Sequence, residues 1–599
     1  MAWYDEAVFY HIYPLGLAGA PKQNDYGEPV HRLNTLLPWV DHIKEIGGSA
    51  LYIGPLFESV GHGYETTDYK KLDSRLGTNE DLTAFVAYCH EQGIKVIFDG
   101  VFNHTGRDFF AFKDIQANRE NSQYKDWYCN VNFWGNNEYN DGFSYDNWGG
   151  YNLLVKLNQK NPAVVDYICD VIRFWVSEFD VDGIRLDAAD VLDFDFMKAL
   201  RRTANEVKPD FWLMGEVIHG DYSRWVNGET LHSVTNYTLH KALYSGHNDH
   251  NYFEIAHTVR RLQNMGTLKL YNFVDNHDVE RIYTKLTNKA HFAPVHVLLY
   301  TLPGVPSIYY GSEFGIEGRK EYGSDDSLRP ALNIEDYKDS VKTNPCTALI
   351  AALGKVRQAV PALSYGSYDE LMLTNRQFAY ARDLDGTRVI VSVNNDDAPA
   401  GMHLAAGNCT AYIGALSGEK VSVQDGHINI TQPANSGEIW VPEGTDLDVK
   451  PVKVVTKTES EAKTNTEDKA ASETAIDAKG NKEAEPKIES KESKDIVAAT
   501  ESADAKKNTT NTEKNISAAN EVKDSAKDAS AQAAADTPVD PETITVDWSK
   551  SPESMTVPEL QAAILAKLAG NGPVDAQMKK TVTDNIWHDS LVNWLKSFR

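Results

Sequence analysis

The chain has 599 residues, of which 42% are hydrophobic and 24% charged, as in a globular protein long enough for several domains. Its 59 basic and 86 acidic residues give a net charge of −27. Because nucleic acids and anionic membranes carry charge of the same sign, the composition disfavours both as partners and leaves neutral ligands open. No apolar run is long enough to cross a bilayer, so we expect no membrane span.

Cysteine usage indicates a reducing compartment. No two cysteines form a Cys-x-x-Cys pair, so neither a zinc site nor a disulfide framework is indicated. The first residues, 1–6, lack the basic and apolar regions of a signal peptide. We therefore expect a cytoplasmic protein. The five cysteines are widely spaced: Cys89, Cys129, Cys169, Cys346 and Cys409.

Short apolar runs alternate with amphipathic helical patterns through the first 360 residues, which predicts an α/β fold, a (β/α)8 TIM barrel. The barrel is assigned to residues 1–103 and 161–360. The stretch 104–160 is long, polar and aromatic, and predicts a subdomain inserted after the third strand. Residues 361–445 change to short strands and predict a C-terminal antiparallel β domain. The eight predicted barrel strands are 7–15, 50–55, 95–101, 181–186, 211–217, 233–238, 270–274 and 306–310.

The remaining chain differs sharply in composition. Residues 446–540 repeat Lys, Glu, Ala, Thr and Ser and lack apolar surface to offset their ordering entropy, so we expect a disordered linker. Residues 541–599 regain tryptophans and predict a small helical tail. A capping box at 556–559 starts one helix and a second would follow from Val574. Because so short a segment rarely makes its own core, we expect the tail to dock on the barrel or on a second copy of the chain.

Polar side chains follow the third, fourth, fifth and seventh predicted strands. The C-terminal ends of barrel strands meet at one face, so these side chains should converge on one pocket. A charge at the end of an apolar strand is costly unless it is paired or used, and paired carboxylates are what glycoside hydrolysis requires. The residues at these strand ends are Asp99, Asn103, His104, Arg185, Asp187, Glu216, His277 and Asp278.

These four segments, in this order and spacing, resemble the four signature regions of the α-amylase superfamily, glycoside hydrolase family 13. The segments 63–69 and 304–313 agree with the same family, and the resemblance covers about residues 3–445. It implies that Asp187 is a catalytic nucleophile, that Glu216 is the general acid/base, and that Asp278 is a third carboxylate holding sugar hydroxyls. Arg185 lies two residues before Asp187, on the same strand face, and would keep that carboxylate ionised.

The resemblance also assigns residues that bind the sugar. It implies that His104 and His277 hydrogen-bond glucose hydroxyls and that Tyr64 is an aromatic platform under the cleaved ring. Asp99 and Asn103 would be structural residues near the site. Arg329, after the eighth strand, resembles a position near the sugar sites, although a loop anchor is an open alternative.

Several positions depart from the family pattern. Glu65 stands where the usual residue is Asp. Asp190 and Val191 replace the Lys-His of many α-amylases, whose His backbone helps hold calcium, so we expect no required cofactor and no metal site. The segment 155–158, Val-Lys-Leu-Asn, resembles the short signature of the neopullulanase, cyclomaltodextrinase and maltogenic amylase subgroup. Those enzymes usually dimerise through an extra N-terminal domain, and since this chain begins at the first barrel strand, we expect that mode to be absent.

Together these features predict a retaining α-glucan hydrolase that cleaves α-1,4 bonds in maltodextrins and cyclodextrins. The small residues Ala188 and Ala189 after Asp187 resemble the pattern of α-1,4-acting members. One alternative is a 4-α-glucanotransferase, which uses the same glycosyl-enzyme but passes it to a sugar. Another is a non-catalytic carbohydrate-binding relative, which the presence of all three carboxylates disfavours.

Overall fold

The computed structural model describes residues 2–449 except 267, 322 and 323, together with 451, 546, 550–552, 555–569 and 595. The chain divides into two compact units, Met1–Lys482 and Glu483–Arg599. Every helix of the described residues is too short or too polar to span a membrane. Nearly all of the predicted linker, 446–540, lies outside the described residues, and its disorder stays a prediction.

Eight parallel strands form the barrel. They pair in the order β11-β10-β9-β5-β2-β1-β13-β12, so the predicted barrel is confirmed. The bridge between Thr235 and Tyr271 and the bond from Asn236 N to Tyr271 O, 2.9 Å, join β11 to β12 and close the ring. The strands are β1 (Phe9–Ile12), β2 (Ala50–Ile53), β5 (Lys95–Gly100), β9 (Gly183–Leu186), β10 (Trp212–Gly215), β11 (Ser233–Val234), β12 (Tyr271–Asn272) and β13 (Val305–Tyr309).

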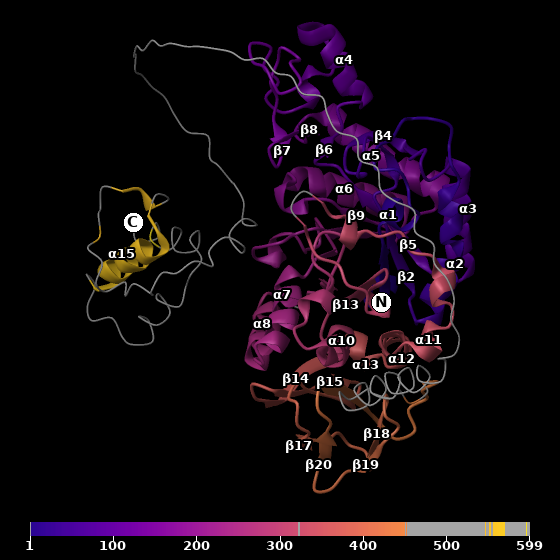
Figure 1. The fold of residues 1–599 in the computed structure, drawn as a ribbon, viewed down its shortest axis with the longest axis vertical. Helices are drawn as coiled ribbons and strands as arrows, with labels where there is room; N and C mark the ends of the chain where they lie inside the picture. Colours follow the sequence, from indigo (N-terminus) through magenta and orange to yellow (C-terminus); the bar gives the residue numbers. More distant parts are fainter. Residues whose placement is uncertain are drawn as a thin grey trace, which may run out of the picture. The chain divides into compact units, whose positions relative to one another are not determined.

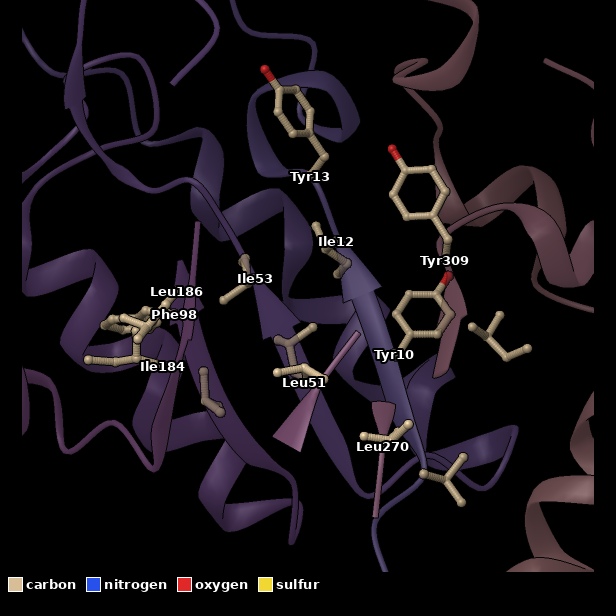
Figure 2. Packing of buried hydrophobic residues seen from close by; sticks show 14 of the residues in the cluster. Tyr10, Ile12, Tyr13, Leu51, Ile53, Phe98, Ile184, Leu186, Leu270 and Tyr309 are labelled. Carbon is tan, nitrogen blue, oxygen red and sulfur yellow. The ribbon is translucent and has the colours of Figure 1, made fainter. Parts of the chain in front are cut away.

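The barrel strands carry apolar residues on both faces because both are buried. One alternating set packs with the helices, and Figure 2 shows its members Tyr10, Ile12, Leu51, Ile53, Ile184 and Leu186. The intervening set forms a second cluster, which includes Phe9, Tyr52, Ile97 and Trp212. Since neighbouring residues on a strand face opposite sides, Arg185 shares a face with the second set, inside the ring.

Helices surround the strands (Figure 1). The helix α5 shows why they begin where they do: the Asn161 side chain accepts from Ala163 N, and Pro162 takes the first position, where no backbone donor is needed. The longer barrel helices are α2 (Leu37–Glu45), α3 (Asn79–Glu91), α5 (Pro162–Phe179), α6 (Phe194–Val207), α7 (Tyr237–Asn248), α8 (Tyr252–Asn264), α10 (Phe292–Thr301) and α12 (Pro345–Ala359). One-turn helices are α1 (Pro14–Leu17), α9 (Ile282–Lys285), α11 (Ser340–Thr343) and α13 (Ala362–Tyr365).

Two additions flank the barrel at opposite ends (Figure 1). The insertion carries α4 (Phe110–Asn118) and a three-stranded sheet in the order β6-β8-β7. Its strands are β6 (His104–Thr105), β7 (Asn147–Trp148) and β8 (Tyr151–Lys156). The bond from Leu157 N to Asn103 O, 3.0 Å, joins the insertion to the end of the third barrel segment. A separate two-stranded sheet, β3 (Phe57–Ser59) with β4 (Thr66–Leu72), follows β2.

The C-terminal part of the first unit is an antiparallel sheet in the order β14-β15-β16-β21-β18-β19, beside the pair β17-β20. It packs on α10, where Thr301 Oγ1 lies 2.5 Å from the hydroxyl of Tyr380. The strands are β14 (Ser367–Leu373), β15 (Gln377–Leu384), β16 (Thr387–Asn394), β17 (Ala400–Ala405), β18 (Ala411–Gly414), β19 (Lys420–Ser422), β20 (His427–Gln432) and β21 (Ser436–Pro442).

The second unit contains the helix α15 (Val557–Ala569). Of the two reciprocal bonds of the predicted capping box, the one in which Thr556 N donates to Glu559 Oε2, at 2.7 Å, is formed. Leu560 and Ile564 are buried in a small cluster within this unit. The second predicted helix, from Val574, lies outside the described residues, and docking of the tail stays a prediction.

Candidate active site

The polar strand ends meet at one face of the barrel, as the sequence predicts. Asp99 on β5 pairs with Arg185 on β9. Just beyond the strands, Asp187 N donates to Gly100 O at 3.1 Å, and Glu216 N donates to Leu186 O at 2.9 Å. The backbone register therefore places these charged side chains side by side, on the inner face of the ring.

The guanidinium of Arg185 lies between three carboxylates. Its Nη1 is 2.8 Å from Asp99 Oδ1 and 3.0 Å from Asp187 Oδ1, and its Nη2 is 2.9 Å from Glu216 Oε2. Only 3% of Arg185 is exposed, so these pairs are formed away from bulk water. A permanently charged, planar fork can satisfy several carboxylates at once, which a lysine could not do with the same geometry.

The backbone after Asp187 also contacts Glu216. Ala188 adopts a left-handed conformation with φ +46° and ψ +43°. Its N–H donates to Glu216 Oε2 at 3.1 Å. The left-handed region is costly for a residue with a Cβ, so this turn is held by its surroundings.

A second set of contacts runs from Asp99 to Asp278. The Tyr64 hydroxyl donates to Asp99 Oδ2 at 3.1 Å and lies 2.5 Å from His277 Nε2. The rings of Tyr64 and His277 stack, with centroids 5.7 Å apart. His277 Nε2 is also 3.0 Å from Asp278 Oδ2. Tyr64 thus links the Arg185 cluster to the third predicted carboxylate.

Arg329 holds Asp278 from the loop after β13. Its Nη2 lies 2.7 Å from Asp278 Oδ1, and its Nε donates to the carbonyl of His277 at 3.0 Å. The guanidinium also lies over the ring of Tyr13, 4.7 Å from the centroid. Arg329 therefore anchors its loop to the strand end that carries Asp278, and its place near a bound sugar stays a prediction.

His104 and Asn103 lie at the edge of this network. His104 Nε2 is 3.1 Å from the carbonyl of Tyr64, and its Nδ1 is 3.2 Å from Asn103 Nδ2. Both residues are buried. In this arrangement His104 supports the backbone of Tyr64, and a direct sugar contact by His104 stays a prediction.

Burial and neighbouring charges shift the acidity of three site residues. Burial raises the pKa of Asp187 well above its usual range. Arg185 lowers this pKa, as the sequence predicts, but does not offset the burial, to which Glu216 and Asp99 add. Burial alone would also raise the pKa of Asp278, but His277 and Arg329 outweigh it and hold that pKa well below its usual range. Burial lowers the pKa of His104 to about 3, so this imidazole is neutral. Asp278 is therefore anionic.

The sequence did not reveal two residues that support the carboxylates of the site, Tyr237 and Asn276. The hydroxyl of Tyr237 donates to Glu216 Oε1 at 3.3 Å and accepts from Asn276 Nδ2 at 3.1 Å. Asn276 Oδ1 in turn accepts from Asp278 N at 2.8 Å. Tyr237 falls inside the sixth predicted strand, 233–238, so the search for polar residues at strand ends did not reach it.

One buried oxygen near the site bears on metal binding. Asn103 Oδ1 is buried and has no hydrogen-bond partner among the described residues. Calcium takes six to eight oxygen ligands, with carboxylates among them. The described residues contain no group of three or more His, Cys, Asp or Glu that could hold an ion. The absence of a calcium site at Asn103 stays a prediction.

Comparisons with known proteins show the family of the chain. The family model described as "Alpha amylase, catalytic domain" matches residues 32–355. A cyclomaltodextrinase of Bacillus sp is 31% identical over 422 residues, which is 66% of this chain and 74% of that protein. Neopullulanase 2 of Thermoactinomyces vulgaris is 29% identical and covers 73% of this chain and 78% of its own length. A solved cyclomaltodextrinase superposes with a TM-score of 0.66 at 27% identity, covering 73% of this chain and 78% of its own.

Proposed function

Because the chain belongs to the α-amylase family of glycoside hydrolases, we propose that it cleaves α-1,4 bonds in maltodextrins and cyclodextrins with retention of configuration. The observation that carries the proposal is the contact of one buried guanidinium, Arg185, with both Asp187 and Glu216. Retaining hydrolysis needs two carboxyl groups at one bond, one to attack and one to transfer a proton. The names of the relatives support α-glucans as the substrate class.

In the proposed first step, a carboxylate oxygen of Asp187 attacks the anomeric carbon while Glu216 gives its proton to the leaving oxygen. The bond from the anomeric carbon to that oxygen breaks, and a covalent glycosyl-enzyme forms. In the second step, Glu216 takes a proton from water, the water oxygen attacks the same carbon, and Asp187 is released. Each step inverts the configuration at the anomeric carbon, so the two steps together retain it.

The contacts around each carboxylate support these roles. Once Glu216 has lost its proton, Arg185 Nη2 and the N–H of Ala188 lie within 3.1 Å to stabilise its charge. Asp278, whose low pKa keeps it ionised, offers negative charge to an oxocarbenium-like sugar. Tyr64 and His277 form the aromatic floor on which we propose that the reacting glucose rests.

The proposed reaction uses groups of this chain alone and requires no cofactor. The five cysteines are all unpaired, which supports a cytoplasmic address. Imported oligosaccharides would then be the substrates, rather than starch granules.

The test determines the anomeric configuration of the first product. The purified protein is given maltoheptaose and β-cyclodextrin, and NMR records the anomer formed before mutarotation. We expect the α-anomer from both substrates; a β-anomer would exclude Asp187 as the nucleophile. Chromatography of the same mixtures separates hydrolysis from transfer, because products longer than the substrate indicate a glucanotransferase.

A further inference from the structure

The insertion exposes a tryptophan that its own core does not use. Trp134 is 98% exposed, whereas neighbouring aromatic side chains such as Phe143 are fully buried. Trp134 lines a concavity of about 660 Å³ together with Phe133, Tyr145, Asn130, Asn132 and Asp146. None of the residues that line this concavity belongs to the Arg185 cluster described above.

The turn that presents Trp134 is fixed on both sides. Trp134 N donates to Asn132 Oδ1 at 3.0 Å, and Asn132 exchanges backbone hydrogen bonds of 2.8 and 3.0 Å with Ser144. A Cβ on Gly135 would lie 2.3 Å from Ser144 Oγ, so glycine permits this close approach. Phe133 anchors the turn, with its ring 5.7 Å from that of Phe143. The indole is therefore held out in water by an ordered backbone.

The chemistry of the concavity selects a neutral, hydroxyl-rich ligand. An exposed indole offers a flat apolar face, while side chains such as Asn130 and Asp146, joined by a 2.8 Å bond, offer planar polar groups beside it. The charged residues that line it, Glu120 and Asp146, are acidic, which disfavours anionic ligands. A protein partner is disfavoured as well, because interface cores are depleted of such charged groups.

From these observations we propose that the surface around Trp134 is a second binding site for α-glucan chains, separate from the catalytic cleft. The proposal rests on the proposed function for its ligand class. The site holds part of a long polysaccharide while another part of that chain is cleaved. It therefore raises the affinity for long glucans and leaves the turnover of short ones unchanged.

Binding is tested by affinity electrophoresis of the full chain in native gels that contain soluble starch. All proteins carry Glu216→Gln so that the glucan is not consumed, and Trp134→Ala and Trp134→Phe are compared with that parent. Phe253→Ala is the matched control, because Phe253 is 46% exposed on α8, far from the insertion in sequence. We expect Trp134→Ala to weaken retardation at least fivefold, Trp134→Phe to keep most of it, and Phe253→Ala to match the parent.

Turnover is then measured in the active background. Trp134→Ala should keep the parent kcat/KM on maltotriose and raise KM on soluble starch. The proposal would be overturned if Trp134→Ala were retarded as strongly as the parent, or if soluble starch did not retard the parent. It would also be overturned if Trp134→Ala lost self-association in sedimentation without losing starch binding. An equal loss on maltotriose would also overturn it, by making Trp134 part of the catalytic cleft. Maltotriose turnover by the wild type tests the proposed hydrolase independently of every starch result.

Discussion

The hydroxyl of Tyr237 lies between Glu216 Oε1 and Asn276 Nδ2, at 3.3 and 3.1 Å. Tyr237 begins α7, directly after β11, whereas Asn276 follows β12. The contact therefore crosses the point at which the barrel closes. It orients the proposed acid/base through a residue that the family signatures do not contain.

Replacing Tyr237 by Phe should lower kcat about tenfold and change KM less. The variant removes one hydrogen bond to Glu216, worth about 1 kcal/mol, and leaves the ring in place. The pH dependence of kcat should also shift, because the carboxyl of Glu216 loses a hydrogen-bond donor. Tyr151→Phe is the control, since Tyr151 is 67% exposed on β8. A Tyr237→Phe enzyme with the parent kcat and pH profile would refute the positioning role.

Asp187→Asn and Glu216→Gln should each reduce turnover of maltoheptaose about a thousandfold without lowering the melting temperature. Each change removes a reacting group but makes no cavity. With 4-nitrophenyl maltoside, whose leaving group needs no protonation, Glu216→Gln should recover part of its first-step rate and Asp187→Asn should not. Equal behaviour of the two variants on both substrates would contradict the assigned roles.

Stability should fall as the pH decreases from about 6.5 to 4. Burial lowers the pKa of His104, His240 and His247 to about 3 and of His232 and His296 to about 4. The unfolded chain takes up these protons near pH 6.5 and the folded chain does not, so acid favours unfolding. The raised pKa values of the carboxyls of Asp187, Asp190, Asp275 and Glu438 act in the opposite sense, whereas the lowered pKa of Asp278 adds to the loss of stability.

Urea unfolding at pH 7, 6 and 5 measures this effect, and His296→Phe should flatten the dependence by about one proton. A midpoint that rises toward pH 5 would contradict the burial of these imidazoles. His403 is the control position, because this exposed side chain has no comparable burial.

Deleting residues 450–540 should leave turnover of maltoheptaose nearly unchanged. The stretch contains no Phe, Trp or Tyr to stack on a sugar. The contacts of the proposed site all come from residues between Tyr13 and Arg329. A large loss of turnover in this deletion variant would show that the stretch contributes to catalysis and is not only a linker.

The sequence predicted the barrel because each strand is buried on both faces and so forms an apolar run that ends in polar residues. The predicted strand 233–238 is too long, because β11 spans only Ser233–Val234 and Asn236 caps the helix α7, which begins at Tyr237. Tyr237 could not be assigned, since its partner Asn276 is brought near only by the closure of the ring. The role of Arg329 was ambiguous for a similar reason, because the residues next to it in the sequence do not show that its loop folds back onto His277.

The closure of the ring between β11 and β12 has a thermal consequence. These are the shortest barrel strands, with two residues each, so local opening there breaks few backbone bonds. Tyr237 and Asn276 lie just beyond them, and Glu216 would lose its support while most of the barrel stays folded. Heating should therefore inactivate the enzyme at a temperature several degrees below that at which circular dichroism records the loss of its helices.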